Sequence, residues 1–230
     1  MRNYVVIGGS SGIGKELVKI LTLKGKVFAT YYQNEVKETS ENIEYQQYDV
    51  LKDTFDLSIL PEEIHGFVYC PGSINLKPFH RFKEEDFTND YNFQVVGAIK
   101  LIQQLLPRLK QSGDSSIVLF STVAVQTGFN FHSQVSASKG AIEGLTRSLA
   151  AEFSPKIRVN AIAPSLTNTS LAGKLLNTPE KVEAQAKLNP MKRVGEAKDI
   201  AATAAFLLSS KSSWITGQIL HVDGGFSTIK

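Results

Sequence analysis

Short apolar runs alternate with longer amphipathic segments along the whole chain. The short runs end at glycine, proline or polar residues, and they predict strands over 4–7, 26–30, 43–48, 66–69, 116–120, 158–162 and 218–222. Segments with apolar residues every three or four positions predict helices over 15–24, 84–109, 134–153 and 199–209. Regular alternation of strand and helix favours a parallel sheet with helices on both faces. We therefore expect one doubly wound α/β domain over residues 1–230.

The first strand runs directly into a glycine-rich turn. Gly8, Gly12 and Gly14 separate it from the first helix, which we expect to end at Gly25. Glycine lets the backbone approach a ligand closely, and a helix start presents unpaired N–H groups, so this order suits a pyrophosphate. An ordinary strand-to-helix turn can show the same spacing. The position of the motif in the first strand-helix unit favours a dinucleotide site.

Composition and charge narrow the class of protein. The 230 residues are 42% hydrophobic, and 25 basic against 22 acidic side chains give a net charge of +3, which offers no basic stripe for nucleic acid. Cys70 is the only cysteine, so no intrachain disulfide forms, as is typical of a reducing compartment. No apolar run approaches the roughly 18 residues of a membrane span. We expect a soluble cytoplasmic protein with a small-molecule substrate, no metal site and no membrane partner.

Several motifs in a fixed order resemble one known family from end to end. They are the glycine turn at 8–14, Asp49-Val50, Asn92, Ser138-Lys139, the segment 158–164, and Gly217 with 223–225. The chain resembles the short-chain dehydrogenase/reductase family, a Rossmann-type NAD(P)-dependent class. The resemblance implies a homotetramer or homodimer built through the two long helices and the last strand. It also implies that the cofactor is bound by Gly8, Ser10, Ser11, Gly12, Ile13, Gly14, Tyr31, Asp49, Val50, Gly72, Lys139, Pro164, Thr167 and Thr169.

The resemblance also implies a set of catalytic residues, and here the chain departs from the family. Lys139 matches the lysine of the family's Tyr-x-x-x-Lys motif, but Val135 stands at the tyrosine position. Thr122, with Ser121 beside it, matches the partner serine, and Asn92 matches the active-site asparagine. Each also has an ordinary structural explanation, as a strand end, a helix asparagine or a solvated lysine.

A missing tyrosine requires another donor. Related enoyl reductases place theirs seven residues before the lysine, which is His132 in this chain. Residues 132, 136 and 139 share a helical face, so His132 or Ser136 could reach the reacting oxygen. A polar loop residue and a helix-capping serine are the alternative interpretations. Cys70 is expected to be a buried side chain and not a reactive thiol.

The end of the second strand indicates which cofactor is preferred. NAD-specific sites usually carry an acidic residue there, whereas this chain has Thr30 and Tyr31 followed by 32–34, with no carboxylate before Glu35. NADP(H) is therefore favoured, with NAD(H) as the alternative. We carry two hypotheses: an NADP(H)-dependent oxidoreductase acting on a carbonyl, hydroxyl or enoyl group, and a dinucleotide-binding sensor or subunit of the same fold without activity.

Overall fold

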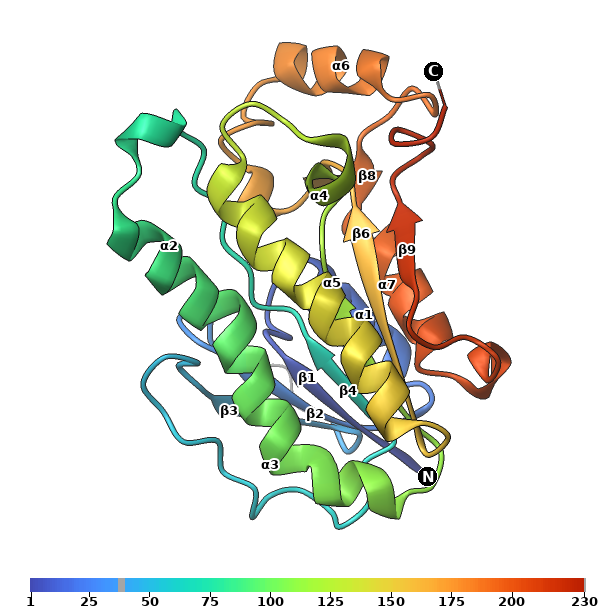
Figure 1. Ribbon diagram of the computed structural model, residues 1–230. Coiled ribbons are helices and arrows are strands. Elements are labelled where there is room, and N and C mark those ends of the chain that lie inside the picture. The colour runs from blue at the N-terminus through green and yellow to red at the C-terminus, as the bar shows by residue number, and fades with distance from the viewer. Residues whose placement is uncertain (37–39, 230) are drawn as a thin grey trace.

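A seven-stranded, wholly parallel sheet forms the centre of the computed structural model, which describes residues 1–36 and 40–229 (Figure 1). The strand order is β3-β2-β1-β4-β5-β6-β9, as predicted for a doubly wound fold. The strands are β1 (Arg2–Ile7), β2 (Gly25–Tyr31), β3 (Ile43–Gln47), β4 (Gly66–Tyr69), β5 (Ser115–Phe120), β6 (Ile157–Pro164) and β9 (Ile219–Val222).

Helices cover both faces of this sheet (Figure 1). One face carries α1 (Gly12–Leu21) and α7 (Ala197–Leu207), and the other carries α2 (Glu84–Tyr91), α3 (Gly97–Gln111) and α5 (Ser133–Phe153). Beyond the carboxyl ends of the strands lie shorter elements: α4 (Ala124–Thr127), α6 (Pro179–Leu188), β7 (Thr167–Asn168) and β8 (Gly195–Glu196). No helix of the described residues is long and apolar enough to cross a bilayer.

The two cores follow from the alternation of side chains along β1. Val5 and Ile7 belong to the cluster under α3 and α5, whereas Tyr4 and Val6 belong to the cluster under α1 and α7. All four side chains are at most 3% exposed. A strand that is buried on both faces reads as a continuous apolar run, which is why the sequence pattern identified it.

Two predicted boundaries need correction. The first helix begins at Gly12, not at Lys15, because glycines of the turn already form its first positions. Gly25 does not end that helix: the C-cap is Thr22, and Gly25 is the first residue of β2. A side chain at Gly25 would collide with the carbonyl oxygen of Arg2 on β1, so glycine is needed there for close strand pairing.

The predicted helix over 84–109 is interrupted. Residues Asn92–Val96 form one π-helical turn, and α3 then continues to Gln111. The Tyr69 hydroxyl from the end of β4 donates to the carbonyl of Phe93 within this turn. Gly97 leaves the room that this contact requires, since a Cβ there would overlap with the hydroxyl. A wide turn of this kind is frequent at functional sites because it turns side chains to a new direction.

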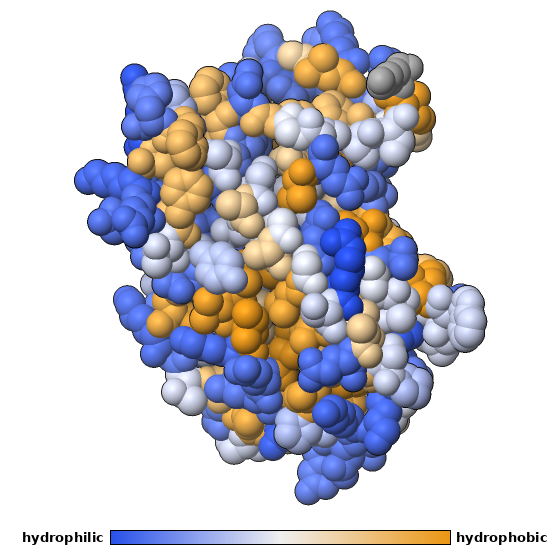
Figure 2. Space-filling model, in the orientation of Figure 1, coloured by the Kyte–Doolittle hydropathy of each residue, from blue (hydrophilic) through white to orange (hydrophobic). Residues whose placement is uncertain are grey.

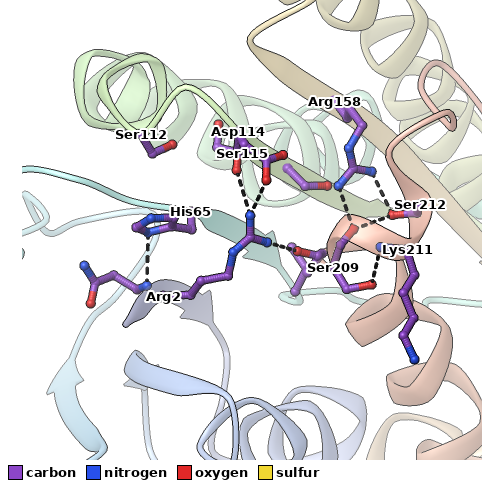
Figure 3. Close-up of polar contacts among 12 residues, drawn as sticks. Arg2, His65, Ser112, Asp114, Ser115, Arg158, Ser209, Lys211 and Ser212 are labelled. Atoms are coloured by element: carbon purple, nitrogen blue, oxygen red, sulfur yellow. Dashed lines mark hydrogen bonds and ion pairs between the residues drawn. The ribbon is translucent and has the colours of Figure 1, made fainter.

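A polar network ties the opposite end of the sheet to the segment before β9 (Figure 3). The Arg158 guanidinium on β6 donates to Ser212 Oγ at 2.9 Å and to the Ser209 carbonyl at 3.2 Å. Arg2 on β1 pairs with Asp114 and donates to the Leu208 carbonyl. These arginines satisfy carbonyls that the end of α7 leaves without helical partners.

Replacing the buried arginine should destabilise the fold. Arg158→Ala leaves these acceptors without their charged donor, and we expect a loss of about 2–3 kcal/mol in the free energy of unfolding. Arg81→Ala, at an exposed position, is the matched control and should change stability by less than about 0.5 kcal/mol. Urea denaturation followed by circular dichroism measures both. Equal effects of the two substitutions would contradict a structural role for Arg158.

Candidate functional site

A cleft of about 920 Å³ lies across the carboxyl ends of the central strands. Every predicted cofactor-binding residue lines it, from Gly8 after β1 to Thr169 after β6. Parallel strands bring these residues to one edge of the sheet although they are far apart in sequence. Of the predicted catalytic residues, Ser121, Thr122, His132 and Lys139 line the cleft.

The glycine turn is held against β2. The amide of Gly8 donates to Thr30 Oγ1 and that of Gly9 to the Thr30 carbonyl, both at 2.9 Å. Gly8 and Gly12 have positive φ angles of 77° and 52°, and a Cβ at Gly14 would overlap with the Gly8 carbonyl. Only glycine allows α1 to start so close to the turn.

The start of α1 is suited to an anion. Ser11 is the N-cap, and its side chain makes no capping hydrogen bond within the helix. The first turn contains no acidic residue. Its N–H groups and the positive end of the helix dipole therefore face the cleft uncompensated, which suits a phosphate.

The other end of the cleft is bounded by residues after β2 and β3. Tyr31 continues into the exposed lining residues Tyr32, Gln33 and Asn34. Asp49 accepts from the Leu51 amide at 2.9 Å, and Lys52 lies 3.7 Å from its carboxylate. Asp49 is the only acidic residue among those described that line the cleft. No carboxylate therefore stands at the end of β2, as the sequence indicated.

Lys139 is the central cation of the site. It comes from α5, is only 7% exposed, and has no hydrogen-bonding partner within the described part of the chain. Burial lowers the pKa of Lys139 to about 8, against the opposing attraction of the Asp90 carboxylate. Val135, one helical turn earlier on α5, also lines the cleft and adds an apolar side chain to its wall.

The two hydroxyls at the end of β5 are not equivalent. Ser121 is buried and donates to Glu143 at 2.8 Å, so its proton is engaged inside the protein. Thr122 is half-buried in the cleft wall, and its oxygen accepts from the Ala124 amide at 3.3 Å. Because that contact uses only a lone pair, the Thr122 hydroxyl is able to donate to a ligand.

His132 and Ser136 are separated by the start of α5. His132 caps the helix and lines the cleft, and its Nδ1 lies 2.8 Å from the Asn130 carbonyl. A carbonyl only accepts, so Nδ1 carries hydrogen and Nε2 is the nitrogen available to a ligand. Ser136 does not line the cleft, and its hydroxyl faces the Ala124 carbonyl at 3.4 Å. The prediction that Ser136 belongs to the site is therefore corrected. Ser136 lies on the side of α5 that faces α4.

Asn92 also requires correction, since it is exposed and lies outside the cleft lining. The π turn brings Gln94 to the cleft instead, with its side chain fully buried. A signal was present in the sequence: Gln94 stands four residues before Ala98 on the apolar face of the helix, where a polar side chain is unusual.

The buried carboxylate of Asp90 lies behind the cleft wall. It accepts from Ser138 Oγ at 2.6 Å, from Gln94 Nε2 at 2.8 Å and from Ser73 Oγ. Asp90 also precedes Gln94 by one helical turn on the apolar face, and its contribution was missed. Cys70 was expected to be a buried side chain, but it is half-buried and lines the cleft; desolvation raises the pKa of its thiol to about 12, which disfavours a reactive thiolate.

Apolar side chains form the remaining wall of the cleft. Phe129 after β5 and Phe226 after β9 are in ring contact, with centroids 5.8 Å apart. The other apolar members of this wall are Ile74, Leu76, Leu171 and Leu175. The described residues contain no cluster of three or more histidine, cysteine or acidic side chains able to hold a metal.

The fold and the cleft define a Rossmann-type dinucleotide-binding protein. A family model described as Enoyl-(Acyl carrier protein) reductase matches residues 8–227. A tropinone reductase homolog of Arabidopsis thaliana is 33% identical over 242 residues, 98% of this chain and 92% of the relative. Senescence-associated protein 13 of the same plant is 33% identical over 238 residues, 96% and 88% of the two chains. The chain belongs to the short-chain dehydrogenase/reductase family.

Solved structures agree with this assignment. Ligand-free aldohexose dehydrogenase of Thermoplasma acidophilum is 25% identical with a TM-score of 0.87, covering 100% of this chain and 95% of that chain. ElxO with NADP bound is 25% identical with a TM-score of 0.86, covering 99% of both chains. Because the chain is a member of this family, the protein belongs to a family of oxidoreductases.

The glycine turn gives a direct test of the dinucleotide site. Gly14→Ala forces the start of α1 away from Gly8, and we expect NADPH affinity to fall at least about tenfold, the equivalent of 1.4 kcal/mol. Gly144→Ala on α5, where a Cβ meets nothing within 4 Å, should leave affinity unchanged and stabilise the helix by up to about 1 kcal/mol. Isothermal titration calorimetry measures both. Unchanged affinity in Gly14→Ala would argue against a phosphate site at this turn.

Proposed function

We propose that the protein is an NADP(H)-dependent oxidoreductase that transfers a hydride to or from a small enoyl or carbonyl substrate without an active-site tyrosine. Lys139 carries the proposal. The Lys139 ammonium is buried in the cleft and makes no hydrogen bond or ion pair with the described residues. The Asp90 carboxylate attracts it without direct contact, so a ligand that accepts its hydrogen bonds would stabilise it. The ribose hydroxyls of a nicotinamide nucleotide are such acceptors.

The chain fits that cofactor at both ends of the cleft. The N–H groups at the start of α1 suit the pyrophosphate, and Gly72 after β4 and Lys139 both line the cleft where the nicotinamide ribose would lie. When bound, the nicotinamide supplies or accepts the hydride. The NADP-bound state of the similar protein ElxO supports the same cofactor here.

Two side chains, those of Thr122 and His132, can donate to the substrate oxygen. Reduction places negative charge on that oxygen, and the Thr122 hydroxyl can donate a hydrogen bond to it. The proton then comes from Nε2 of protonated His132, whose ring is oriented by the Asn130 carbonyl. With a carbonyl substrate the hydride would form the new C–H bond, the π electron pair would move to oxygen, and the proton would end on that oxygen. With an enoyl substrate the hydride would add to the β-carbon, and the proton would end on the α-carbon. Val135 cannot take part.

Val135 is also the observation that favours the second candidate function. A dinucleotide-binding protein that senses the cofactor without turning it over needs the phosphate turn and Lys139 but no proton donor. The Enoyl-(Acyl carrier protein) reductase model supports the enzyme, because reduction of an enoyl thioester depends less on a phenol than ketone reduction does.

We also propose self-association and a cytoplasmic location. Partly buried apolar residues of the two long helices, Ile99, Leu106, Leu145 and Leu149, pack against the core. In the same orientation as Figure 1, Figure 2 shows apolar side chains gathered on the molecular face over α3 and α5. Such a patch supports a homodimer or homotetramer built through these helices. The unpaired Cys70 supports a reducing compartment.

Turnover assays separate the two functions. We expect NADPH oxidation with at least one member of a panel of enoyl and keto thioesters, and a loss of kcat/KM of about 100-fold or more in Lys139→Ala. His132→Gln should lose about 10- to 100-fold, chiefly in kcat. Lys211→Ala, at an exposed site on the far side of the molecule, is the matched control and should retain full activity. NADPH binding without turnover of any substrate would favour the sensor.

Cofactor preference is tested at Lys52. Its side chain is 77% exposed beside the end of β2, and its weak contact with Asp49 leaves it able to meet a 2′-phosphate. We expect Lys52→Ala to weaken NADPH binding about fivefold and to leave NADH binding unchanged, since only NADPH carries the phosphate. Lys15→Ala is the matched control on α1, outside the cleft lining. Equal losses for both cofactors would exclude this role.

A further inference from the structure

Asp90 lies where three elements of the site meet. Its carboxylate, 6% exposed on α2, receives hydrogen bonds from Ser73 in the segment after β4, from Gln94 in the π turn and from Ser138 on α5. It does not line the cleft, so it does not touch a ligand there. Asp90 therefore affects the site only through the residues that it contacts.

The first influence is on the orientation of Gln94. A carboxylate only accepts hydrogen bonds, and Gln94 Nε2 lies 2.8 Å from both oxygens of Asp90. The amide nitrogen therefore faces Asp90, and Oε1 must point away from it. That oxygen is buried and has no partner among the described residues, and it lies 3.8 Å from where a Cβ of Gly72 would stand. An acceptor is thus presented at the edge of the cleft.

The second influence is on charge. Ser138, whose hydroxyl binds Asp90, directly precedes Lys139, and the Asp90 carboxylate is the anion that most favours the ammonium form of this lysine. Of the other titratable groups around Lys139, Cys70 acts in the same direction as Asp90 but more weakly, Glu143 is bound to Ser121 and Arg147, and the His132 ring lies against the Asn130 carbonyl.

We propose that Asp90 is a positioning residue that sets the polarity of the nicotinamide end of the cleft: it turns the Gln94 oxygen toward the ligand and supplies the counter-charge that keeps Lys139 cationic. The inference deepens the proposed function and rests on it for its purpose. Gln94 and Lys139 both belong to the cleft lining, where one acceptor oxygen and one ammonium would suit neighbouring hydroxyl groups such as those of a ribose.

The test measures Lys139 itself, in protein without substrate. Side-chain NMR of protein labelled with ¹³C-lysine follows its titration, with the resonance assigned by its absence in Lys139→Met. We expect the wild-type midpoint near pH 8, and a midpoint lower by about one pH unit in Asp90→Asn, which removes the charge but keeps the shape. Circular dichroism establishes that each variant is folded.

Two further variants separate charge from packing. Ser73→Ala removes one hydrogen bond but keeps the carboxylate, and Gln94→Leu removes the acceptor oxygen; neither should move the midpoint. Gln94→Leu should weaken NADPH binding several-fold by calorimetry. An unchanged midpoint in Asp90→Asn, or an equal shift in Ser73→Ala, would overturn the proposal. Failure to reduce any substrate would count against the proposed function and leave this result intact.

Discussion

Parallel pairing of β1 with β4 and of β5 with β6 determines where the cleft forms. The registers Ile7↔Tyr69 and Phe120↔Ile162 end neighbouring strands at the same level, so the glycine turn, Gly72, Thr122 and Pro164 emerge at one edge. Each strand can hold that register only because its side chains are buried on both faces, since a slip by one residue would exchange the two cores. The packing of the two cores thus determines where the site forms.

Much of this arrangement could be predicted from sequence, because it depends on local and periodic signals. The apolar runs predicted the strands, and the residues that the family resemblance implied for the cofactor all line the cleft. Asn92 and Ser136 lie outside the cleft lining for different reasons: a π turn interrupts the helix at Asn92, whereas Ser136 lies on a regular helix, on the side that faces α4. The π turn at Asn92–Val96 changes which residue faces the cleft, and it depends on Tyr69 and Gly97, contacts between segments that no periodicity reveals.

Buried polar groups were the least predictable part of the site. Asp90 and Gln94 interrupt an apolar helical face. Considered alone, each is only a polar residue at a position where the pattern predicts an apolar one. Their structural role becomes clear only from the hydrogen-bond network that Ser73 and Ser138 complete. These two serines belong to other elements of the fold. A half-satisfied network in a core is unfavourable, so these four residues depend on one another.

The ring contact between Phe129 and Phe226 joins two segments that are far apart in the chain. The glycine turn comes from the first quarter of the sequence, whereas this aromatic wall closes only after β9 has been added to the edge of the sheet. A nascent chain emerging from the ribosome therefore acquires the glycine turn early and the aromatic wall late. Premature termination before Phe226 would leave Phe129 without its ring partner and this wall of the cleft incomplete.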